Sequence, residues 1–156
     1  ADAGVTPFGM YALNSMRVEK GYRAWKGDLS TDYSLLEGGL DRFVKLDKEV
    51  DFPGKVALLN EQQQGRKQGF ATMVMEPGHQ DAPYMAPVWS NGDIIGAVTS
   101  CAMGYRTNQC IALGMLQADY LAEGTELEID VYGTRRKAVV QADAPMWDPK
   151  NERLRA

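Results

Sequence analysis

The sequence predicts a mainly β fold with an α+β amino-terminal segment, in which helix and loop precede a small antiparallel β-barrel or sandwich. Five or six short apolar runs separated by turn residues follow Gly65, and no segment with helical periodicity interrupts them. The Asn91-Gly92 pair lies between two of these runs. Asn-Gly favours a tight hairpin because both turn residues adopt positive φ. We therefore expect each run to pair with its neighbours in an antiparallel sheet.

The strands are predicted from the positions of the apolar runs. The clearest run is 127–131, where Leu127, Ile129 and Val131 alternate with acidic residues, as in a strand with one buried face. The other predicted strands span 70–75, 88–89, 94–98, 111–115 and 137–141. The chain is polar and charged after Trp147, which indicates a surface tail.

Two helices are predicted before the strands. Thr6-Pro7 suits the start of the first, because threonine can cap a helix and proline at the first helical position loses no needed N–H. An apolar stripe then continues to about residue 19 and comprises Phe8, Tyr11, Ala12 and Met16. Gly21 ends this helix. The segment 52–64 predicts a turn followed by a short helix that Gly65 ends.

We place a domain boundary between Leu59 and Gly65, which divides the chain into 1–60 and 61–156. The first part is too small to close a core of its own, whereas the second has enough apolar residues for one. The apolar side of the first helix therefore needs a covering surface. We expect that it folds back on the β domain, pairs with a second copy of the chain or stays mobile, and we favour self-association.

Composition excludes two classes of partner. The chain has 156 residues, with 17 basic against 21 acidic residues and a net charge of −4, so a nucleic-acid surface is not expected. No apolar run approaches the ~18 residues of a membrane span. The first residues lack the pattern of a signal peptide, and a start at Ala1 suggests a fragment of a longer enzyme. We expect a cytoplasmic protein, or one of the mitochondrial matrix in a eukaryote.

Cysteine and histidine are too few for a metal centre or a catalytic triad. Cys101 and Cys110 have no companion at ligand spacing, and His79 is the only histidine. We expect no metal site. A disulfide between the cysteines is compatible with the sequence, but buried free thiols are favoured.

Several segments, in order and with their spacing kept, resemble the glycine-cleavage T-protein family. In the first part these segments are 12–22 (ALNSMRVEKGY), 25–29 (WKGDL), 36–40 (LEGGL), 44–48 (VKLDK) and 51–55 (DFPGK). In the β part they are 93–100 (DIIGAVTS) and 111–115 (IALGM). The ending 147–155 (WDPKNERLR) resembles that of the dimethylglycine and sarcosine dehydrogenases, flavoproteins with a T-protein-like module at the carboxyl end.

The resemblance implies both a fold and a chemistry. The family module has three subdomains around a channel, and this chain would contain the end of the second, folate-binding subdomain and the whole carboxyl-terminal barrel. The module binds tetrahydrofolate, which captures a one-carbon unit as 5,10-methylenetetrahydrofolate. In the dehydrogenases an FAD domain upstream oxidises an N-methyl amine. The implied partners are therefore folate and the amino-terminal portion of the parent enzyme, with a homo-oligomer as a further expectation.

Four residues are implied as folate contacts by their positions in the motifs. Arg17 matches the arginine of the family's R-L-E motif, and a guanidinium can donate two hydrogen bonds to a carboxylate. The alternative for Arg17 is a surface ion pair with Glu19 or Asp28. Trp25 replaces a family tyrosine and could stack on the ligand or pack in a core. Tyr22 is a further candidate, and for Glu19 structural pairing is favoured over a ligand contact.

No catalytic residue is expected in this chain, because the family's catalytic acid lies in the first subdomain. Two other functions remain open. The chain could belong to a free-standing aminomethyltransferase or a related demethylase, or it could be a non-catalytic barrel that docks a partner.

Overall fold

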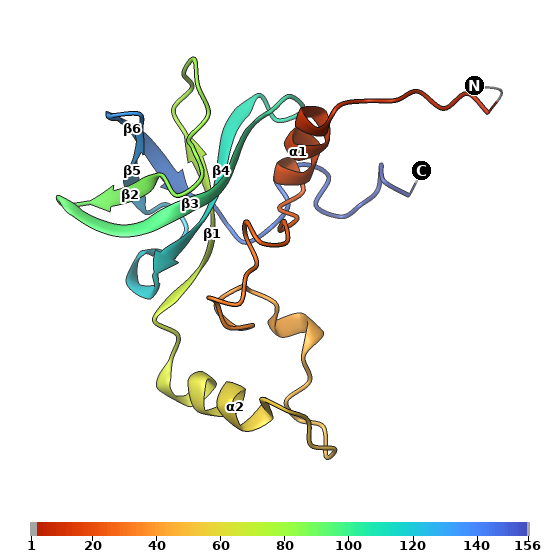
Figure 1. Cartoon of the computed structure of the whole chain (residues 1–156), viewed down its shortest axis with the longest axis vertical. Coiled ribbons are helices and arrows are strands. Elements are labelled where there is room, and N and C mark those ends of the chain that lie inside the picture. The colour runs from red at the N-terminus through yellow and green to blue at the C-terminus, as the bar shows by residue number, and fades with distance from the viewer. Residues whose placement is uncertain (1–2, 156) are drawn as a thin grey trace.

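The computed structural model describes residues 3–155, and its main feature is a closed barrel of six antiparallel strands (Figure 1). The order around the barrel is β1-β4-β3-β2-β5-β6, and β6 pairs with β1 to close it. The strands are β1 Gln68–Met75, β2 Pro87–Ser90, β3 Asp93–Gly104, β4 Gln109–Gln117, β5 Glu126–Val131 and β6 Thr134–Val140. The predicted fold class is confirmed, and the barrel is the correct choice between barrel and sandwich.

The helices lie outside the barrel. They are α1 Met10–Glu19 and α2 Lys55–Gln64, with short 3-10 turns η1 Asp41–Phe43 and η2 Ala118–Tyr120. α1 packs on β3 and β4, whereas α2 buries none of its residues and lies apart from the barrel in Figure 1. Among residues 3–155, no helix has the length and apolar character that crossing a membrane requires.

Turn chemistry was the most accurate local prediction. Asn91 and Gly92 both have positive φ, 51° and 91°, so the β2–β3 hairpin has the predicted turn. Tyr132 and Gly133 repeat this geometry between β5 and β6, with φ values of 52° and 86°. Gly21 and Gly65 follow the two helices with positive φ, as expected for glycines that end helices.

The predicted start of the first helix was wrong. α1 begins at Met10 with Gly9 at the N-cap, where no side chain caps the helix, and Thr6-Pro7 precede it in irregular structure. The local signal of Thr6-Pro7 fails because nothing packs there: every described residue before Asn14 is exposed. Contacts with the barrel begin only in the second turn of α1, so they stabilise the helix from there on and add nothing at Thr6-Pro7.

The side of α1 that meets the barrel also differs from the predicted apolar stripe. α1 buries Ser15, Val18 and Glu19, and Val18 belongs to an apolar cluster on the outer face of the barrel. Its barrel neighbours in that cluster are Phe70, Ala102, Ile111, Leu113 and Met115. In contrast, Phe8 is 65 % exposed and Tyr11 94 % exposed. The helix therefore does fold back on the β domain, but its predicted apolar stripe stays exposed instead of packing on the barrel.

The barrel interior is a second, larger apolar cluster. It includes Met73, Val88, Val98, Leu116 and Ile129, all fully buried. Two glycines allow the strands that carry it to pack closely. A Cβ at Gly96 would lie 2.2 Å from the backbone oxygen of Met115, and one at Gly114 would lie 2.5 Å from that of Ala97. Because both obstacles are backbone atoms, β3 and β4 could accept a side chain only by moving apart.

We predict that Gly96→Ala lowers the free energy of unfolding by about 2 kcal/mol or more, since overpacking against backbone distorts the β3–β4 pair. Urea denaturation measures this. Gly9→Ala is the control, because nothing lies within 4 Å of a Cβ there and its φ of −81° suits alanine. Equal midpoints for the two variants would contradict the close approach.

Candidate functional site

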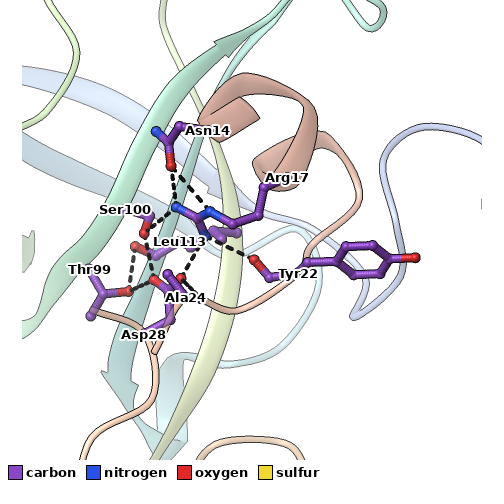
Figure 2. Close-up of polar contacts among 8 residues, drawn as sticks. All are labelled: Asn14, Arg17, Tyr22, Ala24, Asp28, Thr99, Ser100 and Leu113. Carbon is purple, nitrogen blue, oxygen red and sulfur yellow. Dashed lines mark hydrogen bonds and ion pairs between the residues drawn. The ribbon is translucent and has the colours of Figure 1, made fainter. Parts of the chain in front are cut away.

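A buried ion pair joins α1 to the loop that follows it. The Nη1 of Arg17 lies 2.7 Å from Oδ2 of Asp28, and the two side chains are 17 % and 0 % exposed. Arg17 comes from the last turn of α1, and Asp28 from the tight turn of residues 24–29 (Figure 2). The predicted alternative named Asp28 as a partner on the surface, but the structure places this pair in the interior.

The carboxylate of Asp28 accepts hydrogen bonds on both oxygens. The backbone N–H of Ala24 donates to Oδ2 at 2.7 Å, while the hydroxyls of Thr99 and Ser100 donate to Oδ1 at 2.6 and 2.7 Å. Burial of a carboxylate is tolerated when such donors replace its hydration. The arrangement fastens the 24–29 turn to β3 where β3 deviates from regular pairing with β4.

The guanidinium of Arg17 has an acceptor for each of its five N–H bonds (Figure 2). Nε and Nη2 both donate to Oδ1 of Asn14, and Nη2 also donates to Oγ of Ser100 at 2.9 Å. Nη1 donates to Asp28 and, at 2.9 Å, to the carbonyl oxygen of Tyr22. A ligand carboxylate would have to displace one of these bonds to reach Arg17.

Glu19 holds the turn between β3 and β4. Its side chain is 2 % exposed, and Oε1 accepts the N–H groups of Arg106 and Thr107 at 2.6 and 2.9 Å. These two donors would otherwise need another acceptor in the hairpin turn. Glu19 thus joins the end of α1 to the barrel at a second point, 87 residues away in sequence from Arg106.

The two aromatic candidates lie on the surface beside this network. Tyr22 is 50 % exposed, and Figure 2 shows its ring pointing away from the Arg17 cluster although its carbonyl is part of it. Trp25 is 71 % exposed, on a turn closed by the bond from Lys26 N to Leu29 O. The structure therefore brings the Arg17 cluster into contact with the Tyr22 backbone only, and leaves both rings accessible.

A cleft of about 420 Å³, which we call the Arg23 cleft, adjoins Tyr22. Residues from four separate parts of the chain line it, among them Tyr22, Arg23, Gly39, Arg42, Thr72, Asp143 and Asn151. Lys20 also lines it, but its ammonium donates to the carbonyls of Trp147 and Asp148 and to Oδ1 of Asn151. Two further cations, Arg23 and Arg42, line the cleft beside the carboxylates Asp41 and Asp143, and motif matching did not single out either arginine.

Cys101 and Cys110 are also brought together by the barrel. Their Sγ atoms lie 4.0 Å apart and both thiols are free, which agrees with the predicted free thiols. Asp81 lies close to the pair. The hydrogen bond with Cys110 and burial raise the pKa of the Cys101 thiol. Spacing in sequence gives no signal for this group, because the β3–β4 register creates it.

We predict that Asp28→Ala lowers the free energy of unfolding by about 3–5 kcal/mol, because Arg17 would remain buried without its counter-charge. The control Glu128→Ala removes the exposed pair with Arg135 and should cost less than about 1 kcal/mol. The double variant Arg17→Ala, Asp28→Ala should be more stable than the sum of the single variants predicts, since no unpaired charge remains. Additive losses in denaturation would contradict a coupled buried pair.

Comparison with known proteins identifies the family. The model of the glycine cleavage T-protein C-terminal barrel domain matches residues 69–148, and that of the GCVT N-terminal domain matches residues 1–48. The chain is 32 % identical over 154 residues to dimethylglycine dehydrogenase of Rattus norvegicus, covering 98 % of this chain and 18 % of that protein. It is 30 % identical over 162 residues to sarcosine dehydrogenase of Mus musculus, covering 97 % and 17 %.

Shorter relatives and a solved structure agree with this match. The aminomethyltransferase of Synechocystis is 33 % identical over 130 residues, covering 83 % of this chain and 35 % of that protein. The crystal structure of the glycine cleavage system aminomethyltransferase T from Bartonella henselae has the same fold, with a TM-score of 0.86 at 24 % identity. The match covers 96 % of this chain and 42 % of the Bartonella chain. The chain belongs to the family of the glycine cleavage T-protein C-terminal barrel domain.

Proposed function

We propose that this chain is the carboxyl-terminal part of a tetrahydrofolate-binding module in a flavin-dependent N-methyl amine dehydrogenase, of the dimethylglycine or sarcosine type. It helps to capture a one-carbon unit as 5,10-methylenetetrahydrofolate. In this proposal residues 1–60 end the folate-binding subdomain and 61–156 form the barrel, while FAD and the catalytic acid belong to other parts of the enzyme. The matches over 97–98 % of the chain to two such dehydrogenases support this assignment.

The observation that carries the folate proposal is the Arg23 cleft, which Tyr22 lines, together with the accessible ring of Trp25 on the turn that follows Arg23 in the chain. Tetrahydrofolate combines flat rings with a tail of carboxylates. Exposed rings such as Tyr22 and Trp25 can stack on the former, and arginines can bind the latter. The residues present therefore fit the ligand chemistry.

The Arg17 network has a positioning role in this proposal. It fixes the backbone of Tyr22 and the 24–29 turn, and thereby the surface from which the Tyr22 and Trp25 rings extend. Direct contacts of Arg17 and Glu19 with folate stay predictions, and each would require the loss of a bond that now holds α1 on the barrel.

An aminomethyltransferase that carries no flavin domain is the alternative, because the Synechocystis protein matches the same fold region. The rat and mouse dehydrogenases are named as mitochondrial. We therefore extend the proposal to the mitochondrial matrix for a eukaryotic source.

We predict that Trp25→Ala in the enzyme that contains this chain weakens tetrahydrofolate binding about fivefold, the effect of losing one aromatic stacking contact. Trp25→Phe should retain most of the affinity. Tyr132→Ala is the control, since Tyr132 is 70 % exposed in the β5–β6 turn, away from the Arg23 cleft. Folate titration followed by calorimetry measures all three, and an unchanged affinity of Trp25→Ala would remove this residue from the site.

We also propose that the exposed stripe of α1 pairs with a second copy of the chain or with the rest of the enzyme. Tyr11 and Met16 of α1, and Phe8 just before it, remain accessible although α1 is docked on the barrel, and exposed apolar patches of this kind are typical of contact surfaces.

For the isolated chain we predict concentration-dependent sedimentation that Tyr11→Glu abolishes, because a charge would have to be buried in the pair. Val56→Glu is the control, on the exposed face of α2, and should leave sedimentation unchanged. A monomer at all concentrations, before any substitution, would exclude self-association and leave the rest of the enzyme as the partner.

A further inference from the structure

Arg23 is a nearly buried cation whose hydrogen bonding is incomplete. Its side chain is 10 % exposed, and its Nε atom is fully buried without an acceptor among the described residues. The one carboxylate that it reaches is Asp143, at 3.4 Å from Nη2, and the side chain of Asp143 is 72 % exposed. Arg17 differs in this respect, because all its N–H groups have acceptors.

The surroundings hold the Arg23 guanidinium in place without neutralising it. The ring of Phe70 lies under it, with its centroid 4.0 Å from Cζ. Gly39 lies close to the Nη2 group of Arg23, since a Cβ at Gly39 would be 2.7 Å from that nitrogen. The planar group is therefore in close contact with an aromatic ring and with a glycine, which restrict its position as in a preorganised binding group.

The carboxylates of the cleft leave the charge of Arg23 incompletely compensated, because Asp41 and Asp143 both line the cleft but only Asp143 bonds to Arg23, at 3.4 Å. Burial lowers the pKa of Arg23 below its ordinary value, because lost hydration outweighs the attraction of Asp143, and the charge of Arg42 acts in the same direction as burial. Both arginines line the Arg23 cleft. An anion in the cleft would relieve their repulsion and supply the acceptor that Nε lacks.

We infer that the Arg23 cleft binds a carboxylate through Arg23, with Arg42 as a second cation. This identification of the ligand rests on the proposed function: the carboxylates that bind in the Arg23 cleft are those of the glutamyl tail of folate. Asp143 then acts as a competitor that binds the guanidinium loosely in the free protein and is displaced by the ligand, because its carboxylate is 72 % exposed and 3.4 Å away.

The test uses the 156-residue chain and γ-linked triglutamate, which carries the tail without the rings of folate. The side-chain Nε–H signal of Arg23 is followed by ¹⁵N NMR during titration. We expect a saturable shift of this signal, an affinity at least about tenfold lower in Arg23→Gln, and an intermediate loss in Arg23→Lys. Asp143→Asn should bind triglutamate about threefold more tightly, since the competitor is gone.

Two controls separate this site from general attraction of anions. Arg135 lies over the ring of Trp89, outside the cleft, so Arg135→Gln should leave the affinity for triglutamate unchanged. Asp93→Asn, at the β2–β3 turn, should also leave it unchanged. If Arg23→Gln binds as the natural chain does, or if the Nε–H signal does not move at saturation, the inference is overturned. Inorganic phosphate is titrated in parallel, and tighter binding of phosphate than of triglutamate at Arg23 would overturn the assignment to a carboxylate.

Failure of this inference is distinguishable from failure of the proposed function. Tetrahydrofolate with one glutamate is titrated into the enzyme that contains this chain, with and without Arg23→Gln. An affinity for tetrahydrofolate that is the same with and without Arg23→Gln would overturn the inference and leave the proposed function intact. Triglutamate binding at Arg23 without any binding of folate supports the carboxylate site and contradicts the proposed function.

Discussion

The buried pair of Arg17 and Asp28 is the interaction on which the amino-terminal segment depends. Removing two charges from water costs several kcal/mol per ion, so such a pair persists only when its remaining donors and acceptors are also satisfied. Asn14, Tyr22, Ala24, Thr99 and Ser100 supply those partners. Because they come from α1, the following loop and β3, the pair cannot form unless all three segments are in place.

Three basic residues within seven positions show how context divides similar side chains. Arg17 is neutralised by Asp28 and Lys20 is satisfied by the carbonyls and amide of the carboxyl-terminal segment, so both hold the structure together. Arg23 is also held in place, by Phe70 and Gly39, but its Nε has no acceptor among the described residues and Asp143 accepts only a long bond from Nη2. Arg17, which the family motif singles out, therefore has a structural role, whereas Arg23, which the motif does not include, has an N–H group that is free to bind a ligand.

Sequence reasoning succeeded where structure is local and failed where it depends on distant partners. Strand alternation at 127–131 and the Asn91-Gly92 turn follow from backbone preference and burial of one face, which a short segment encodes. The buried face of α1 depends on contacts with β3 and β4, which the apolar stripe did not predict, and Thr6-Pro7 has no contact that would support a helix there. Arg17 was placed near the site by motif, but only the fold shows that its donors are taken and that Arg23's are not.

The carboxyl-terminal segment completes the same unit, although the sequence indicated only a surface tail. The ammonium of Lys20 donates hydrogen bonds to three acceptors in residues 147–151, and the N–H of Trp147 donates to the carbonyl oxygen of Glu19. The carboxylate of Asp148 in turn accepts the N–H groups of residues 152–154. The end of the chain therefore lies against the end of α1 and forms one wall of the Arg23 cleft, through Asp143 and Asn151. Residues 20–23, whose backbone Arg17 bonds at Tyr22, line the cleft as well, so its shape depends on the docking of both peripheral segments on the barrel.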